Sequence, residues 1–117
     1  MPVVLNGKKF KCLVDTGSAC TIIRKSVATK LEVVPKQEHT LLRSFDGSYV
    51  ASTGDVELEV RVGQPQAVIR GTVVDDEKLL HDCIIGRDFL DLPYVMLVKI
   101  GTKVHVTRLG DERRLWS

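Results

Sequence analysis

The segment that follows Gly54 constrains the fold of this chain more than any other. Apolar side chains occupy every second position of the segment, and charged ones lie between them: Val56, Leu58, Val60 and Val62 alternate with Glu57, Glu59 and Arg61. Successive side chains of a β-strand point to opposite faces, so this pattern predicts a strand with one buried face and one face in water. The chain must therefore build a sheet that covers one side of a core.

The other apolar runs are also short, and residues typical of turns separate them. They predict further strands over residues 3–5, 9–14, 21–23, 41–45, 48–50, 67–74, 83–85, 94–100 and 103–106. Asn6-Gly7 and Asp46-Gly47 are typical of hairpin turns. Helix is expected only over 25–31 and 87–90. The pattern indicates an all-β domain of the barrel or sandwich type.

The length and the charge of the chain limit the classes of function. At 117 residues the chain forms one domain, 1–117, with a polar tail over 110–117 that we expect to be flexible. The net charge is +2 and the basic residues are scattered, so we expect no nucleic-acid partner. No stretch reaches the roughly 18 apolar residues of a membrane span, and no signal peptide opens the chain, so we expect no membrane partner.

The three cysteines are Cys12, Cys20 and Cys83. Their number is odd, and their spacing is not that of a metal site. We therefore expect free, buried thiols in a reducing compartment, with no metal and no cofactor.

One motif carries a candidate catalytic group. Asp15-Thr16-Gly17-Ser18 follows the apolar run 12–14, and a second apolar run resumes at Thr21. An ionised carboxylate in such apolar surroundings is costly unless another group interacts with it. The motif occurs once in the chain, and by itself it is also compatible with an ordinary turn.

A second motif favours a catalytic role for Asp15 over an ordinary turn. It begins with Ile84, Ile85 and Gly86 and continues with Arg87, Asp88 and the apolar pair Phe89-Leu90. Together with Asp15-Thr16-Gly17, in this order and at this separation, it resembles the retropepsins, the aspartic proteases of retroviruses and retrotransposons. The resemblance extends from residue 3 to about residue 106. The residues of the second motif are most similar to those of gypsy-type retrotransposon and endogenous-retrovirus proteases.

The resemblance implies a closed, barrel-like domain with one short helix near its C-terminus, a flap hairpin and a C2 homodimer. Asp15 would be the catalytic residue. Two carboxylates that share one proton can activate a water molecule and protonate a leaving amine. Since the chain has one such motif, the second carboxylate would be Asp15 of another copy, because a two-fold axis brings equivalent residues together.

The neighbours of Asp15 would support the catalytic loop. The resemblance implies that the Thr16 hydroxyl bonds across the dimer axis, that Gly17 lets the substrate backbone approach, and that Ser18 donates a hydrogen bond to the aspartate. Such a donor lowers the pKa of a carboxyl group, so we expect activity on the acidic side.

The second motif would have a structural role. Gly86 is expected to cross close behind the Asp15 loop, where no side chain fits. Many retroviral relatives carry an acid at the position of Ala19, so Arg87 lacks that ion-pair partner here. Asp88 or an acid of the partner chain could replace it, and Arg87 as a solvated surface charge stays an alternative.

The substrate would lie extended between the flap and the floor of the site, bonded through its backbone. The flap would be the hairpin from about 42 to 53, and a simple surface hairpin is the alternative. Residues expected to contact substrate are Ala19, Ile22, Phe45, Asp46, Gly47, Ser48, Val50 and Ile84. Apolar pocket walls predict apolar side chains on both sides of the scissile bond.

We therefore expect an aspartic endopeptidase that acts on polypeptides, most simply the polyprotein of a retroelement, in the cytoplasm or within a virus-like particle. Two alternatives stay open. The domain could be a domesticated, dimerising or peptide-binding module, or a cellular retropepsin-like protease excised from a longer protein.

Overall fold

The computed structural model describes residues 3–36, 41–43 and 49–111 of the chain. It consists mainly of short strands with two α-helices and one 3-10 helix. In chain order the elements are β1 (Val3–Leu5), β2 (Lys8–Phe10), β3 (Cys12–Val14), β4 (Ile22–Arg24), α1 (Lys25–Lys30), β5 (Leu41–Arg43), β6 (Tyr49–Ala51), β7 (Gly54–Val62), β8 (Gln66–Val74), η1 (Asp76–Lys78), β9 (Cys83–Ile85), α2 (Arg87–Leu90), β10 (Val95–Ile100) and β11 (Lys103–Arg108). The prediction of a mostly β domain is confirmed.

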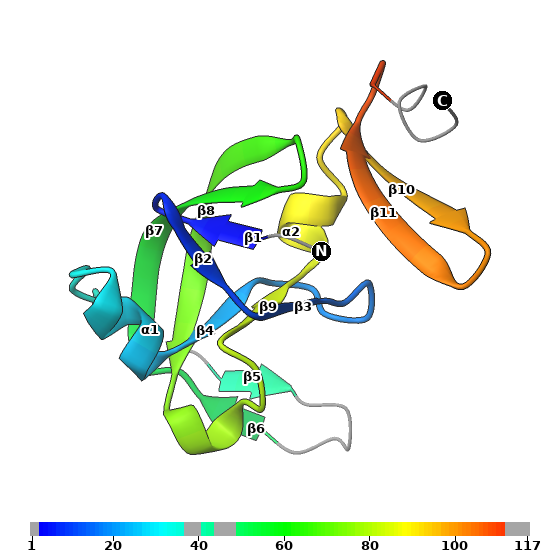
Figure 1. Cartoon of the computed structure of the whole chain (residues 1–117). Coiled ribbons are helices and arrows are strands. Elements are labelled where there is room, and N and C mark those ends of the chain that lie inside the picture. The colour runs from blue at the N-terminus through cyan, green and yellow to red at the C-terminus, as the bar shows by residue number, and fades with distance from the viewer. Residues whose placement is uncertain (1–2, 37–40, 44–48, 112–117) are drawn as a thin grey trace.

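Seven strands form one sheet in the order β2-β1-β7-β8-β4-β9-β3 (Figure 1). The two strands at its ends, β2 and β3, follow one another in the chain and are joined by Lys11 alone. The sheet therefore nearly closes on itself and has the barrel-like form expected for this sequence.

The predicted N-terminal hairpin is confirmed, although it is shorter than expected. β1 and β2 pair antiparallel, and Asn6 and Gly7 take the turn with φ angles of 47° and 83°. The prediction of one continuous strand over 9–14 is wrong. The strand breaks at Lys11, and its second half, β3, pairs parallel with β9 instead. This exchange of partners allows the sheet to curl round.

The predicted alternation of β7 is confirmed. Leu58, Val60 and Val62 have no exposed surface, whereas Glu57, Glu59 and Arg61 are exposed. β7 pairs antiparallel with β8 along nearly its whole length. Burying one such aliphatic side chain stabilises the fold by about 1.5–3 kcal/mol, so this pair of strands forms the centre of the core.

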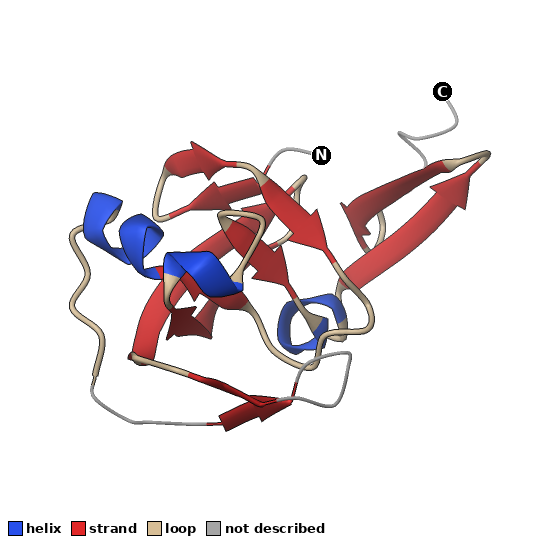
Figure 2. Ribbon diagram, turned by 90° about the horizontal axis from the view of Figure 1, so that it is seen from below, coloured by secondary structure: helices blue, strands red, loops and turns tan. Residues whose placement is uncertain are grey.

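The helices α1 and α2 pack against the strands of the barrel (Figure 2). α1 buries Val27 and Ala28 against the core. The predicted helix over 87–90 is confirmed as α2, whose Phe89 is fully buried.

The strands β10 and β11 form a separate two-stranded sheet. In both views this hairpin projects away from the barrel (Figures 1 and 2). Its base is attached to the barrel, because Val106 is buried and the Tyr94 hydroxyl donates a hydrogen bond to the Gln66 carbonyl at 3.1 Å. Leu97, the cross-strand partner of Val106, and Val104, which lies nearer the hairpin turn, are exposed.

Among the described residues, no helix is both long enough and apolar enough to cross a membrane.

Candidate active site

The Asp15 loop begins where β3 ends and is tied to the neighbouring strand. The Asp15 amide donates to the Ile85 carbonyl of β9 at 3.0 Å. A tight turn follows, in which the Ser18 amide donates to the Asp15 carbonyl at 3.2 Å. The Gly17 amide donates to the Asp15 carboxylate at 2.8 Å. These bonds hold a half-buried carboxylate in a fixed orientation at the surface of one chain.

Gly86 lies directly behind this loop. A Cβ atom at Gly86 would stand 2.4 Å from the Cys20 carbonyl oxygen and 2.8 Å from that of Ser18. Both obstacles are backbone atoms, so they cannot swing aside as a flexible side chain could. The next residue, Arg87, donates its amide to the same Ser18 carbonyl at 2.8 Å. The second motif therefore forms the rear wall of the Asp15 loop.

The Ser18 hydroxyl is directed away from the carboxylate. It donates to the Cys20 carbonyl at 2.7 Å, so the expectation that it bonds Asp15 is wrong within this chain. The loop turns sharply after Ser18, and this turn brings the Cys20 carbonyl closer to the hydroxyl than the carboxylate. The donor to the aspartate is the Gly17 amide instead. A hydrogen bond from Ser18 to Asp15 is therefore not available as a basis for an acidic pH optimum.

A buried polar network joins the two motifs. Thr21, which is fully buried, donates its amide and its hydroxyl to the Asp88 carboxylate at 2.9 Å and 2.7 Å. The Thr21 hydroxyl also accepts a hydrogen bond from the Gly86 amide at 3.2 Å. Asp88 accepts a further bond from the Phe89 amide at 2.9 Å. These charge-assisted bonds link β4, β9 and α2 around the base of the site.

This network supplies the hydrogen-bond donors of the Asp88 carboxylate. Asp88 is occupied by backbone and hydroxyl donors, so the suggestion that it pairs with Arg87 is wrong within the chain. Arg87 is exposed, and its side chain has no hydrogen bond or ion pair with any residue in the described ranges. Thr21 was missed as a site residue, although a single hydroxyl at the head of the apolar run 21–23 was a usable signal.

Of the residues expected to contact substrate, Ile22 and Ile84 are brought together. They are direct partners on the antiparallel strands β4 and β9, and both are half-buried. Ala19 is exposed on the Asp15 loop, as are Thr16 and Gly17.

Strands β5 and β6 pair antiparallel, with Val50 opposite Leu42. Hairpin arms are thus present where the flap was expected. Four of the residues expected to contact substrate from the flap, Phe45, Asp46, Gly47 and Ser48, lie outside the described residues.

Burial is the main cause that raises the pKa of the Cys20 thiol, and the charge of Asp88 adds to it. Both effects disfavour the thiolate form of Cys20, which is the reactive form of a cysteine. In the part of the chain that the structure describes, no group of three His, Cys, Asp or Glu side chains could hold a metal ion.

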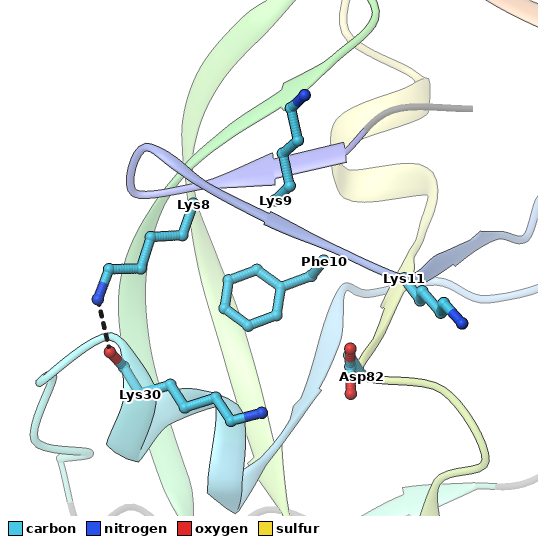
Figure 3. A pocket seen from close by; sticks show the side chains of 6 residues that line it. All are labelled: Lys8, Lys9, Phe10, Lys11, Lys30 and Asp82. Atoms are coloured by element: carbon cyan, nitrogen blue, oxygen red, sulfur yellow. Dashed lines mark hydrogen bonds between the residues drawn. The ribbon is translucent and has the colours of Figure 1, made fainter.

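An open cavity of about 650 Å³ is strongly basic, and Asp15 is not among the residues that line it (Figure 3). Its lining consists of Lys8, Lys9, Phe10, Lys11, Lys30 and Asp82. The Lys8 ammonium group donates to the Lys30 carbonyl at the end of α1, at 3.0 Å. Since the lysine head groups reach into water, this cavity is a solvated basic surface next to the site rather than the site itself.

The fold and the arrangement of the two motifs define a retropepsin-like aspartic protease domain. Residues 1–91 match the family model described as "gag-polyprotein putative aspartyl protease". The match covers most of the chain, so the chain belongs to this family of aspartyl proteases. A comparison with curated proteins gives no match.

Three solved structures have a similar fold. The retroviral protease-like domain of Ddi1 from Leishmania major is 19% identical, with 94% of each chain covered and a TM-score of 0.63. The EIAV protease, complexed with the inhibitor HBY-793, is 20% identical over 78% of this chain and 83% of that one, with a TM-score of 0.62. A retropepsin-like aspartic protease from Rickettsia conorii is 23% identical over 91% of this chain and 78% of that one, with a TM-score of 0.65. At these identities the likeness establishes the fold alone.

Proposed function

We propose that this chain is a homodimeric aspartic endopeptidase whose active site pairs Asp15 with Asp15 of a second copy. The observation that carries the proposal is the half-buried Asp15 carboxylate, fixed by the Gly17 amide at 2.8 Å and backed by Gly86. A positioned carboxylate of this kind suits proton transfer. Proteases of the retropepsin class act as homodimers on peptides, which supports the same assembly here.

In the proposed mechanism the two carboxylates share one proton, because like charges a few Å apart cannot both ionise. The ionised carboxylate takes a proton from a water molecule, and that water attacks the scissile carbonyl carbon. The protonated carboxyl group hydrogen-bonds the carbonyl oxygen. A proton is then transferred to the amine as the C–N bond breaks.

The proposed substrate is an extended polypeptide with apolar side chains beside the scissile bond. The side chains of Ile22 and Ile84, paired across β4 and β9, would form one pocket wall. The β5–β6 hairpin would close over the peptide and exclude water. The description of the family as gag-polyprotein proteases favours the polyprotein of a retroelement as the natural substrate.

The β10–β11 hairpin carries the surface we propose for the second copy. Leu97 and Val104 are 38% and 48% exposed on this small sheet, which has no other strand beside it in the described part of the chain. Exposed apolar groups and free sheet edges of this kind are suited to pairing with another chain.

The test is Asp15→Asn. The substitution keeps the size of the side chain and removes its charge, so we expect cleavage of an apolar peptide library to fall by at least about a thousandfold while the fold stays intact. Circular dichroism and sedimentation serve as controls, and both should match the unmodified protein.

A mixing experiment tests the shared site directly. Addition of Asp15→Asn chains in excess to unmodified chains should suppress activity, because mixed dimers carry a single aspartate. Activity that survives in a monomer, or that is indifferent to the added variant, contradicts the proposal. A domesticated binding module would bind the peptides without cutting them.

A further inference from the structure

Two cysteines face each other on the strands that carry the two motifs. Cys12 of β3 and Cys83 of β9 are direct partners in the parallel register. Residues paired in this way lie on the same face of the sheet, and both cysteines pack in the core cluster. Asp15 follows Cys12 by three residues, and Gly86 follows Cys83 by three.

The two thiols differ in their access to solvent. Cys83 has no exposed surface, whereas Cys12 is half-buried. A hydrogen bond with the Cys12 thiol, and then burial, raise the pKa of the Cys83 thiol far above its ordinary value. A small oxidant therefore reaches Cys12 first, since reactivity follows exposure and thiolate character.

We propose that Cys12 and Cys83 form an oxidation site for hydroperoxides, which converts the two thiols into a reversible disulfide. In the first step the O–O bond of hydrogen peroxide breaks, the Cys12 sulfur is oxidised to a sulfenic acid and one water molecule leaves. In the second step the Cys83 sulfur attacks the Cys12 sulfur, the S–O bond breaks and a second water leaves with the Cys83 proton. Two thiols of a reductant reverse the reaction.

The backbone spacing permits this bond. Neighbouring strands lie about 4.8 Å apart, and disulfides join Cα atoms about 4.4–6.8 Å apart. Contact between the thiols makes the second step intramolecular, which compensates for the weak acidity of Cys83. Lys11 and Asp82, which directly precede the two cysteines, line the open basic cavity, so peroxide can approach this end of the strand pair (Figure 3).

The bond would act on the active site through the two strands. The Asp15 amide bonds the Ile85 carbonyl just beyond the cysteine pair. The strand spacing lies inside the range allowed for a disulfide but below its preferred Cα separation of about 5.5–6 Å, so we expect closure of the bond to spread the two strands slightly. A misplacement of about 1 Å can cost about a hundredfold in rate, so we expect oxidation to lower activity by at least about tenfold.

The experiment treats the full chain with a small excess of hydrogen peroxide and measures its intact mass. We expect a loss of two hydrogen atoms with no added oxygen. Tryptic digestion without reductant should then join fragment 12–24 to fragment 79–87, and reductant should separate them. Because fragment 12–24 also contains Cys20, the same digestion of Cys20→Ser identifies the partner. The link should persist in that variant and vanish in Cys12→Ser.

The activity arm rests on the proposed function, and the mass and digestion arms do not. Peroxide should lower peptide cleavage by the unmodified protein and by Cys20→Ser, but not by Cys12→Ser, and reductant should restore it. A link between Cys20 and Cys83 overturns the proposal. The proposal is also wrong if Cys12 keeps an added oxygen atom while Cys83 can still be alkylated after the protein is unfolded. If the protein carries the Cys12–Cys83 disulfide and still cleaves peptide at an unchanged rate, the proposed effect of the bond on the active site is wrong. If no cleavage is seen before oxidation, only the proposed function fails.

Discussion

The central strand β7 and the β10–β11 hairpin use apolar residues in opposite ways. In β7 every inward side chain is covered, and Leu58 has no exposed surface. On the hairpin, Leu97 belongs to the same residue type and is 38% exposed. The inward face of β7 is covered within one chain, whereas the hairpin has apolar side chains that one chain leaves exposed. If the proposed dimer forms through the hairpin, stability and assembly depend on different parts of the molecule.

The largest expected effect on stability is that of Leu58→Ala. Truncation of a fully buried leucine removes apolar burial and leaves a cavity, so the free energy of unfolding should fall by about 2–5 kcal/mol. Urea titration followed by circular dichroism measures it. A loss below about 1 kcal/mol would contradict the view of the barrel as a tightly packed core.

The next effect is that of Thr21→Val, which keeps the shape of the side chain and removes its hydroxyl. Asp88 loses a donor at 2.7 Å, and the Gly86 amide loses its acceptor at 3.2 Å. Because these groups lie in a largely buried network, we expect the free energy of unfolding to fall by about 1–3 kcal/mol. The control is Thr29→Val on the exposed side of α1, which should change it by less than about 0.5 kcal/mol. Equal effects of the two variants would refute a special role for the Thr21 network.

The smallest effect on stability is expected for Leu97→Ala, which matches Leu58→Ala in chemistry. Since Leu97 is exposed in the single chain, the free energy of unfolding of the monomer should change by less than about 0.5 kcal/mol. The dissociation constant of the proposed dimer should instead rise by about tenfold or more, which sedimentation at several concentrations measures. The contrast between β7 and the hairpin is wrong if Leu97→Ala lowers the free energy of unfolding as much as Leu58→Ala does.

Much of the fold follows from local patterns. The alternation over Val56–Val62 and the turn at Asn6-Gly7 each depend on a few neighbouring residues, and the structure has both. The two motifs also indicated which segments meet, since Asp15 and Ile85 are joined by a backbone hydrogen bond.

Features set by long-range pairing could not be predicted from the sequence. The break at Lys11 could not be seen in the run 9–14, because the run contains no turn residue and the two strands are separated only by their different partners. The direction of the Ser18 hydroxyl depends on where the chain turns at Cys20. The contact between Cys12 and Cys83 depends on the exact register of β3 on β9.

The parallel pairing of β3 with β9 has a consequence for folding and synthesis. Asp15 lies near the start of the chain, and the strand that holds it is closed by residues 83–85. Such a distant pairing closes a long loop, and contacts of this kind form slowly. While a ribosome is still making the first two thirds of the domain, the Asp15 loop has no rear wall. The active site is therefore assembled late, after nearly the whole barrel has been synthesised.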